Sequence, residues 1–433
     1  MKLITAFFLF FLSVSFNLVA QNLPLTFRTG PAQMKIEANG TALTLKAGPN
    51  GSRIAQLKPG TYQFTFSHPG YISQSLSYTL QTKDQVIEQK LELEDSPLEF
   101  IRYINTQKRP KSVEFTPDGR YVVTAPLSGR NPQVFRVSDW SLVAELQTPE
   151  QYAKQQGFVE FAFLPELDEF WVSQMYTNAL HIFKLSDFSY KETLDSSGQF
   201  PKVICVHPDG RVFVSNWVSQ TIAVIDSKTR KTLKKIPVKG TPRGMAVSPD
   251  GKTIFIANFD HGTLDVLDTT SYTITKRLFE KGGKLPSGGA KRHIITDTVK
   301  NRLYMTDMAR GSIFALDLAD FSLVAEVKIG QKANTTKLSP DGKWLYACTR
   351  GTNNRVDYEI KGPDFGTLVM IDTDTMTIHS TQFGGNQPTG LALSKDGKTV
   401  IFSDFLDHRL QVYRVKLEPE SPYHFPTFES LSP

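Results

Sequence analysis

A short pattern recurs along most of this chain, and it constrains the fold more than any other feature. Alternating apolar residues lead into Pro-Asp-Gly, and another apolar run follows. Five copies lie at 113–119, 204–210, 245–251, 336–342 and 391–397, where Lys395 replaces Pro in the last copy, and two degenerate copies lie at 161–167 and 294–300. The seven copies recur about every 46 residues, which is the period of a four-stranded propeller blade.

The residue types within each copy suit tight turns between short strands. Pro pre-sets one backbone angle of the turn, and Gly accepts the left-handed conformation. A later apolar run in several copies ends in Asp, whose carboxylate can accept hydrogen bonds from backbone amides and so stabilise the start of the next turn. This group consists of Asp226, Asp268, Asp317 and Asp372. Because these residues recur in register, we interpret them as turn residues rather than as metal ligands.

The two ends of the repeat region predict how a ring of blades would close. The last copy supplies three strands, and the Pro-rich tail at 418–433 does not suit a fourth. Residues 98–104 form a spare apolar run that aligns with the fourth strands of other copies. We therefore predict an all-β chain in which residues 96–417 form a seven-bladed β-propeller, with the N-terminal strand completing the last blade.

Two of the copies carry a family resemblance. Val214-Ser215-Asn216-Trp217 is followed by a run that ends in Asp226, and Ile256-Ala257-Asn258 by one that ends in Asp268. These units resemble the YVTN family of β-propeller repeats of surface-layer-type and periplasmic proteins. The resemblance covers about residues 96–417 and implies the fold. It leaves the function open, because related propellers include binding proteins, lactonases and the propeller subunit of amine dehydrogenases.

Residues 1–20 have the pattern of an export signal. Lys2 precedes an apolar run at 3–12, and Ala20 is a small residue that suits cleavage. The alternative is an uncleaved N-terminal anchor. No other apolar stretch is long enough to span a membrane. We therefore predict an exported protein, either periplasmic or at the cell surface, with no transmembrane segment after removal of the signal.

Residues 21–95 lack the repeat and are predicted to form a separate small β-sandwich. Pro59-Gly60-Thr61-Tyr62 leads into a predicted strand in which polar and apolar residues alternate, and Pro69-Gly70-Tyr71 follows that strand. This pair of motifs resembles PEGA-type and carboxypeptidase-regulatory-like modules, which implies an adhesive or spacer role.

Charge and cysteine content exclude some classes of partner and of crosslink. The net charge of +6 is spread along the chain, so no basic tract points to nucleic acid. Cys205 and Cys348 are the only cysteines, and the repeat places them in non-neighbouring blades. We expect both to be buried free thiols.

The long connections of the predicted propeller all fall on one face. They are residues 149–157, 280–289 and 350–366, and they include Arg350. Long loops on one side of a rigid scaffold are where binding groups concentrate. Neutral insertion, the alternative, would scatter them over both faces.

Alignment of the copies predicts which side chains ring the central channel on that face. These are Lys111, Val159, Lys202, Arg243, Arg292, Asn334 and Thr389, with Glu160 and His293 beside them. Four of the seven are cationic, and converging cations attract anions. Arg243 and Arg292 could bind a carboxylate or phosphate through bidentate hydrogen bonds. The alternative is that these long side chains point into a hydrated channel with no ligand.

A second group of polar residues follows the second strand of each copy. It comprises Gln174, Asn216, Asn258, Asp307 and Asp404, with Tyr176, Trp217, Phe259 and Phe405 beside them. Amide and carboxylate groups next to aromatic rings suit sugar or peptide recognition. The alternative role for Asn216 and Asn258 is to cap their own loops.

The chain carries no catalytic signature such as His-Glu-x-x-His or Gly-x-Ser-x-Gly, and no cofactor motif. We therefore predict a non-catalytic protein that binds an anionic or polar ligand: a small molecule, a peptide, an envelope glycan or an envelope protein. One alternative is a lactonase-like hydrolase, in which Glu160, Asp307 and Asp404 bind Ca²⁺ and His293 transfers a proton. Another is an envelope scaffold.

Overall fold

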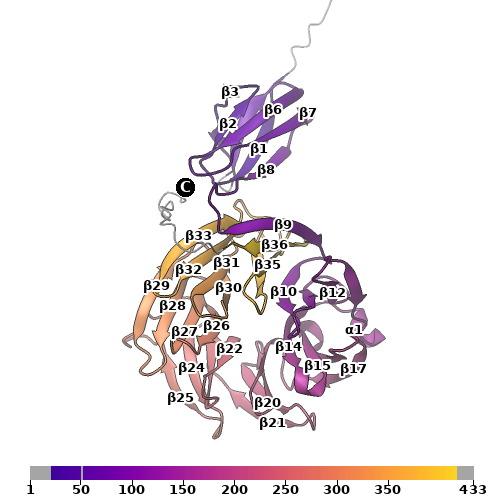
Figure 1. Ribbon diagram of the computed structural model, residues 1–433, viewed down its shortest axis with the longest axis vertical. Helices are drawn as coiled ribbons and strands as arrows, with labels where there is room; N and C mark the ends of the chain where they lie inside the picture. The colour runs from indigo at the N-terminus through magenta and orange to yellow at the C-terminus, as the bar shows by residue number, and fades with distance from the viewer. Residues whose placement is uncertain (1–20, 50–51, 417–433) are drawn as a thin grey trace, which may run out of the picture.

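Seven four-stranded antiparallel sheets surround a central axis in the computed structural model, which describes residues 21–49 and 52–416 (Figure 1). The predicted export signal and the Pro-rich tail lie outside the described residues. The innermost strands contact one another in the order β10, β14, β18, β22, β26, β30 and β34, and β34 contacts β10 again. The predicted seven-bladed propeller is therefore confirmed.

The first four blades follow one another along the chain, each from its innermost to its outermost strand. Blade 1 contains β10 (Pro110–Phe115), β11 (Tyr121–Pro126), β12 (Gln133–Arg136) and β13 (Leu142–Glu145). Blade 2 contains β14 (Phe158–Leu164), β15 (Glu169–Gln174), β16 (Ala179–Lys184) and β17 (Tyr190–Asp195). Blade 3 contains β18 (Pro201–Val206), β19 (Arg211–Asn216), β20 (Thr221–Asp226) and β21 (Thr232–Pro237). Blade 4 contains β22 (Pro242–Val247), β23 (Thr253–Asn258), β24 (Thr263–Asp268) and β25 (Ile274–Leu278).

The remaining blades keep the same order except for the outer strand of the last. Blade 5 contains β26 (Lys291–Asp297), β27 (Arg302–Asp307), β28 (Ser312–Asp317) and β29 (Leu323–Lys328). Blade 6 contains β30 (Ala333–Leu338), β31 (Trp344–Thr349), β32 (Thr367–Asp372) and β33 (Thr377–Phe383). Blade 7 contains β34 (Pro388–Leu393), β35 (Thr399–Asp404), β36 (Arg409–Val415) and β9 (Leu98–Asn105).

The predicted closure of the ring is also confirmed. Strand β9 pairs antiparallel with β36, from Leu98 opposite Val415 to Asn105 opposite Arg409. An early strand thus completes the sheet formed by the last three, so one blade joins the two ends of the propeller region.

The turns inside the blades form as their residue types predict. The Ser248 hydroxyl donates to Asp250 at 2.6 Å, and the Lys252 amide donates to the same carboxylate oxygen at 3.0 Å. Gly251 in this turn has a φ of 72°. At the next turn type, the amides of Lys228 and Thr229 donate to Asp226 at 2.9 and 2.7 Å.

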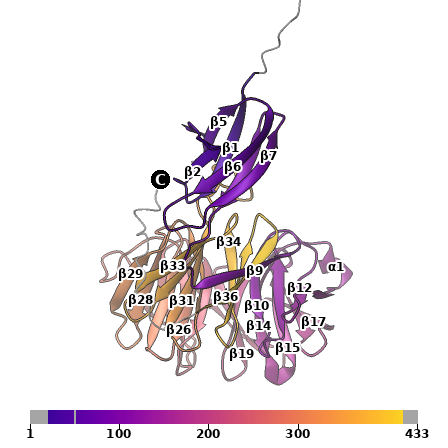
Figure 2. The same cartoon turned by 45° about the horizontal axis from the view of Figure 1, so that its top comes forward.

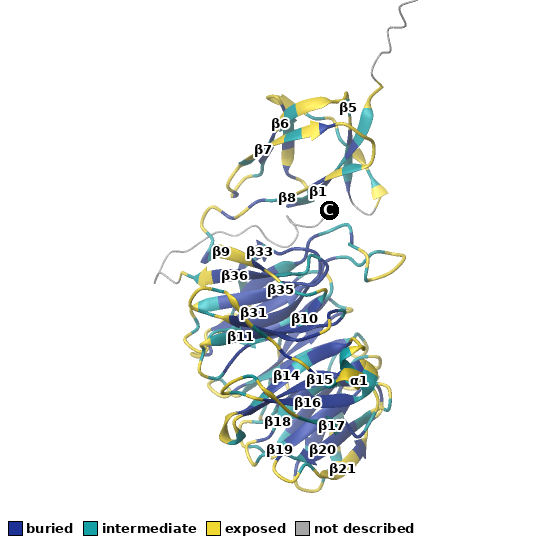
Figure 3. Ribbon diagram, turned by 90° about the vertical axis from the view of Figure 1, so that its right-hand side faces the viewer, coloured by how far each residue is buried: buried dark blue, intermediate teal, exposed yellow. Residues whose placement is uncertain are grey.

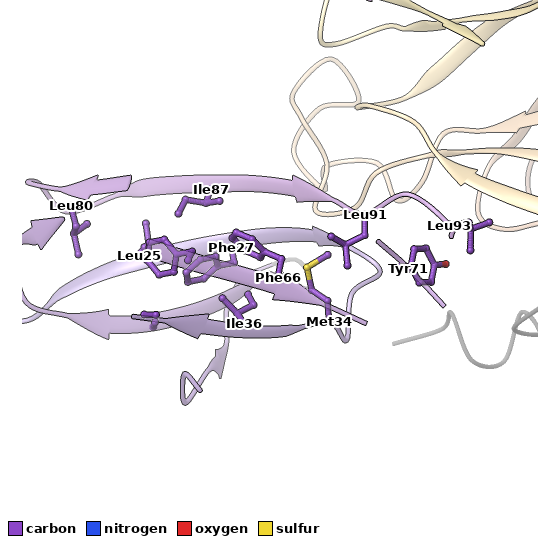
Figure 4. Packing of buried hydrophobic residues seen from close by; sticks show 13 residues of the cluster. Leu25, Phe27, Met34, Ile36, Phe66, Tyr71, Leu80, Ile87, Leu91 and Leu93 are labelled. Atoms are coloured by element: carbon purple, nitrogen blue, oxygen red, sulfur yellow. The ribbon is translucent and has the colours of Figure 1, made fainter. Parts of the chain in front are cut away.

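The segment before the propeller is a β-sandwich of two four-stranded sheets. One sheet has the order β4 (Lys46–Ala47), β5 (Arg53–Leu57), β1 (Leu23–Gly30) and β8 (Gln85–Lys90). The other has the order β3 (Thr41–Ala42), β2 (Lys35–Ala38), β6 (Gly60–Ser67) and β7 (Gln74–Leu80). Its core includes Phe27 and Phe66, whose ring centroids lie 6.3 Å apart, and it is closed at one end by Tyr71 and Leu93 (Figure 4).

The sandwich rests on the rim of the propeller at blades 6 and 7 (Figure 2). Phe383, the last residue of β33, packs against the sandwich core and lies 6.3 Å from the ring of Tyr71. An added Cβ at Gly30 would lie 2.9 Å from the Phe383 ring, so the two bodies meet closely there. Lys361 in the loop after β31 also pairs with Glu88 of the sandwich, at 3.4 Å.

Burial depends on the position of a strand within its blade. The middle strands of the blades are almost wholly buried, whereas outer strands such as β21 are mostly exposed (Figure 3). Cys205 and Cys348 are free thiols, as predicted, but Cys205 is only half-buried. Burial raises their pKa values to about 12 and about 11. None of the helices among the described residues is long and apolar enough to cross a membrane.

Candidate functional site: the mouth of the central channel

The seven residues predicted to ring the channel occupy equivalent positions in the structure. Each is the second residue of its innermost strand, as Lys111 is in β10 and Arg292 is in β26. In five blades the residue two positions earlier has a left-handed φ between 57° and 103°; these are Arg109, Gly157, Phe200, Lys332 and Gln387. The same backbone reversal therefore precedes most of the channel residues.

Hydroxyl groups from neighbouring blades hold several channel residues in place. Ser173 of blade 2 donates to the carbonyl of Lys202 at 2.9 Å, and Ser215 of blade 3 donates to that of Arg243 at 3.2 Å. Thr306 of blade 5 donates in the same way to Asn334, at 2.6 Å. Packing between blades thus fixes the backbone from which the channel side chains project.

Five cationic side chains come together at the mouth, and we call them the mouth cluster: Lys111, Lys202, Arg243, Arg292 and Arg350. They come from blades 1, 3, 4 and 5 and from the loop that follows β31. Arg243, Arg292 and Arg350 are only 6%, 8% and 4% exposed. Lys111 and Lys202 are more open. Arg350 is predicted as a ligand-binding residue of a long loop, and the structure brings it to the same place as the aligned residues.

The guanidinium groups of the mouth cluster have mostly neutral partners. Arg243 donates to Glu160 at 3.2 Å, and this is the cluster's one ion pair among the described residues. Arg292 donates to the side-chain oxygen of Asn334, and Arg350 donates to that of Gln387. The Nε of Arg350 is buried without a hydrogen-bond acceptor in the described part of the chain.

Aromatic rings and a thioether line the same mouth. The Lys111 ammonium lies 5.0 Å from the centre of the Phe405 ring, and the Arg350 guanidinium lies 5.6 Å from that ring. Lys202 lies 5.4 Å from the Trp217 ring and 2.8 Å from the sulfur of Met175. These contacts partly offset the free-energy cost of burying the cations, but they supply no negative charge.

The cations of the mouth cluster act on one another. Burial, and then repulsion from Arg292, Arg350, Arg243 and Lys202, holds the pKa of Lys111 well below its usual value. Burial, and then Arg243 and Arg292, lowers the pKa of Lys202 to about 7, while Glu160 opposes the shift. The mouth is therefore a site of strong positive potential.

His293 is poorly suited to the proton-transfer role considered for it. Burial, and then the cations Lys337, Arg243 and Arg292, lowers its pKa well below the usual value, so its ring is neutral at neutral pH. Its Nδ1 accepts a hydrogen bond from the Thr336 amide at 3.4 Å. The ring is thus a weak base with one nitrogen already engaged.

The second predicted group does not face the channel. Gln174, Asn216, Asn258, Asp307 and Asp404 are fully buried at the ends of the second strands. Each of these strands lies one place outward, so Asn216 is paired with Pro201 and Asp404 with Pro388, next to the channel residues. The predicted binding group is thus separated from the mouth by the width of one strand.

These buried side chains hold the loop that enters their own blade. Asp307 accepts the Ala290 amide at 2.9 Å, and Asp404 accepts the Gly385 amide at 2.6 Å. Asn216 donates to the Ser196 carbonyl at 3.2 Å. In contrast, Asn258 donates to the hydroxyl of Thr263 within its own sheet, at 3.2 Å.

Glycines in the entering loops mark this structural role in the sequence. A Cβ on Gly289 would overlap the Asp307 carboxylate, and a Cβ on Gly385 would overlap that of Asp404. A glycine two or three positions before the innermost strand thus indicates, in the sequence, that the polar residue at the end of the second strand holds the entering loop.

Trp217 and Phe259 remain half-buried beside the mouth, with ring centroids 5.2 Å apart. Trp217 contacts the mouth cluster through Lys202. Of the predicted second group, these aromatic neighbours therefore come closer to the cluster than the amides and carboxylates do.

The acidic residues of the alternative calcium site do not form a metal site. No group of three or more His, Cys, Asp or Glu side chains within residues 21–49 and 52–416 could hold a metal ion. Asp307 pairs with Lys291 at 2.6 Å, Asp404 with Arg409 at 3.0 Å, and Glu160 with Arg243. The structure does not bring Glu160, Asp307 and Asp404 together, and each carboxylate pairs with a different cation.

Comparisons with known proteins agree with the fold. Residues 291–431 match the family described as SMP-30/Gluconolactonase/LRE-like region. Antigen Lp49 of Leptospira interrogans is 36% identical over 364 residues, which cover 81% of this chain and 77% of Lp49. The seven-bladed beta-propeller protein Rv1057 of Mycobacterium tuberculosis is 26% identical over 140 residues, or 31% of this chain and 33% of that protein.

A hydrazine synthase is similar in both sequence and structure. Its subunit beta from Kuenenia stuttgartiensis is 25% identical over 264 residues, covering 59% of this chain and 55% of that subunit. A solved chain of the Kuenenia stuttgartiensis enzyme superposes with a TM-score of 0.60 at 15% identity, over 72% of this chain and 97% of that chain. At that identity the structural likeness shows the fold alone.

Proposed function

Because this chain belongs to the β-propeller family that includes antigen Lp49, we propose that it is an exported propeller protein that binds an anionic ligand at its mouth cluster. The relative's name, an antigen, supports an exported location. The long loops lie at the same face of the propeller as the cluster, so they would border the bound ligand.

The proposal rests on one observation: five basic side chains converge, and among the described residues Arg243 alone of them has an ion-pair partner, Glu160. Holding buried like charges together costs free energy unless an opposite charge compensates them. Intrachain hydrogen bonds provide neutral acceptors such as Gln387 instead. A bound anion would provide that charge, and each charge-assisted hydrogen bond would contribute about 1.5–3 kcal/mol.

The mouth cluster suits binding better than bond cleavage. Its groups are donors on long side chains, and the imidazole considered as a proton-transfer group, His293, is held neutral. Donors of this kind orient and neutralise an anion. The partner can be a free small molecule or the acidic part of a peptide, glycan or envelope protein, since the cluster recognises the charge.

The match of residues 291–431 to a gluconolactonase-like region supports a second candidate, a lactonase-like hydrolase. The described residues do not fit a metal centre, so no metal-dependent step is derived for it. A sugar lactone incubated with the protein, with and without added Ca²⁺, tests this candidate directly. Hydrolysis that Arg243→Ala abolishes would favour it over a purely binding role.

The test of anion binding uses phosphate, citrate and pyrophosphate as probes, titrated calorimetrically into the mature protein. We expect binding that weakens steeply with added NaCl and that is lost in the double variant Arg243→Ala/Arg292→Ala. A matched control removes the same two charges from the exposed rim, as Arg102→Ala/Arg414→Ala. Lys202→Gln provides a milder change at a half-exposed position if the double variant does not fold.

Two results would contradict the proposal. One is wild-type protein that binds none of the three anions at low salt. The other is a folded Arg243/Arg292 variant that binds them as tightly as the rim control does.

A further inference from the structure

A cavity of about 370 Å³ lies between blades 1 and 7 and the loop that follows β31. Its lining includes Lys108, Arg109, Ser128, Gln156, Glu359 and His408. None of these residues is predicted individually as a site residue, although Gln156 and Glu359 lie in two of the long loops predicted to carry binding groups. The volume falls within the range of small-molecule sites.

The cavity adjoins the mouth cluster. Leu406 in its lining follows Phe405, whose ring faces Lys111 and Arg350. Glu359 follows Tyr358, whose ring lies 5.5 Å from the Arg350 guanidinium. Arg109 stands two residues before Lys111. The mouth cluster and the cavity are thus connected through Phe405, Tyr358 and the segment from Arg109 to Lys111.

The chemistry of the cavity differs from that of the mouth. Arg109 already pairs with Glu359 at 2.5 Å and donates to the Ser128 hydroxyl at 3.1 Å. The Nδ1 of His408 accepts a hydrogen bond from the Arg109 amide at 3.1 Å. Burial is the largest of the effects that lower the pKa of His408. Lys361, also in the lining, pairs with Asp407 at 2.7 Å. Arg109 and Lys361 thus already have counter-charges, and what remains is Lys108 together with a set of hydrogen-bond donors and acceptors.

Gln156 and Lys108 complete this set from exposed positions at the rim. An amide offers both a donor and an acceptor, and so does a serine hydroxyl. Sugar hydroxyl groups need both kinds of partner, whereas a second anionic group would find Lys108 as the one lining cation without an ion-pair partner among the described residues. The cavity therefore suits a neutral, hydroxyl-rich body.

We infer that the ligand is a phosphorylated saccharide, with its phosphate at the mouth cluster and its sugar body in the cavity. This inference rests on the proposed anion-binding function. A phosphate monoester carries close to two negative charges at neutral pH and three acceptor oxygens, which match several guanidinium and ammonium donors at once. A carboxylate offers one charge and two oxygens to the same five cations.

The test compares inorganic phosphate, a panel of hexose and disaccharide phosphates, glucuronate and unmodified glucose by calorimetry on the mature protein. We expect at least one sugar phosphate to bind about tenfold or more tightly than phosphate, and glucose not to bind. Gln156→Ala and Ser128→Ala should each remove most of that gain and leave phosphate binding unchanged. Gln151→Ala, at an exposed glutamine near the same loop, is the matched control.

The possible outcomes distinguish a failure of the saccharide inference from a failure of the proposed anion site. If phosphate binds but no sugar phosphate binds more tightly, or if Gln156→Ala weakens both equally, the saccharide inference is wrong and the anion site stands. Tighter binding of glucuronate than of any sugar phosphate would overturn the choice of phosphate. If neither phosphate nor any member of the panel binds, the proposed function fails as well.

Discussion

Asp307 and Lys291 form an ion pair in the interior of blade 5, with 2.6 Å between the carboxylate oxygen and the ammonium nitrogen and with both side chains fully buried. The ammonium also lies 4.5 Å from the ring of Phe279 and 4.6 Å from that of Phe314. Asp307 additionally accepts backbone amides from the loop that leads into the blade. The pair therefore ties the long loop at 280–289 to the sheet of blade 5.

Asp307→Ala should destabilise the protein by about 3–5 kcal/mol, because it leaves a buried ammonium without its counter-charge. Urea unfolding followed by tryptophan fluorescence measures the change. The double variant Asp307→Leu/Lys291→Met should recover part of the loss, since it removes both charges. If the Asp307→Ala protein is as stable as the wild type and loses only anion binding, Asp307 is a binding residue rather than a structural one.

Anion binding should take up protons near neutral pH. The pKa of Lys202 is about 7 in the free protein, so this side chain is partly neutral there. A bound anion favours the charged form and raises that pKa, and affinity should therefore fall as the pH rises from about 7 towards 9. Titrations in buffers of different ionisation enthalpy measure the protons taken up.

Lys202→Met provides the control for this proton linkage. It should bind anions more weakly and with a flatter pH dependence than the wild type. An unchanged pH profile in this variant would assign the linkage to another group, of which Lys111 is the first candidate.

Phe383→Ala should loosen the sandwich from the propeller. The ring packs against the sandwich core beside Tyr71, and burial of a phenyl ring contributes about 1.5–3 kcal/mol. We expect faster proteolysis in the connecting residues 94–97, with little change in the unfolding of the propeller. Protection equal to that of the wild type would mean that Lys361 and Glu88 hold the two bodies together without the ring.

Ile104→Pro should open the ring at blade 7. Ile104 is buried in β9 and is paired with Leu410 of β36, where proline cannot donate to the ladder. The expected loss is about 3 kcal/mol or more, with a lower midpoint of thermal unfolding. Ile101→Thr, at an exposed position of the same strand, should leave the midpoint within a degree or two.

The predicted channel residues could be found from the sequence because each repeat places the same strand position at the axis. Arg243 and Arg292 stand at equal distances from their Pro-Asp-Gly-type turns, and blade geometry brings them together. The ends of the second strands follow the same alignment. For Asn216 the alternative of holding its own loop agrees with the structure, whereas the prediction for Asp307 does not anticipate the loop that crosses it. The YVTN and PEGA-like resemblances stay predictions.

The order of the residues alone determined the number of blades, the strand that closes the ring and the positions that line the channel, because a repeat of constant period imposes one pairing pattern on every copy. Only the tertiary structure decided which polar groups are free to meet a ligand. Whether a side chain faces open space or a neighbouring backbone depends on the path of loops such as 350–366. Those loops have no counterpart in the other repeats, and they are placed by contacts between residues far apart in the chain.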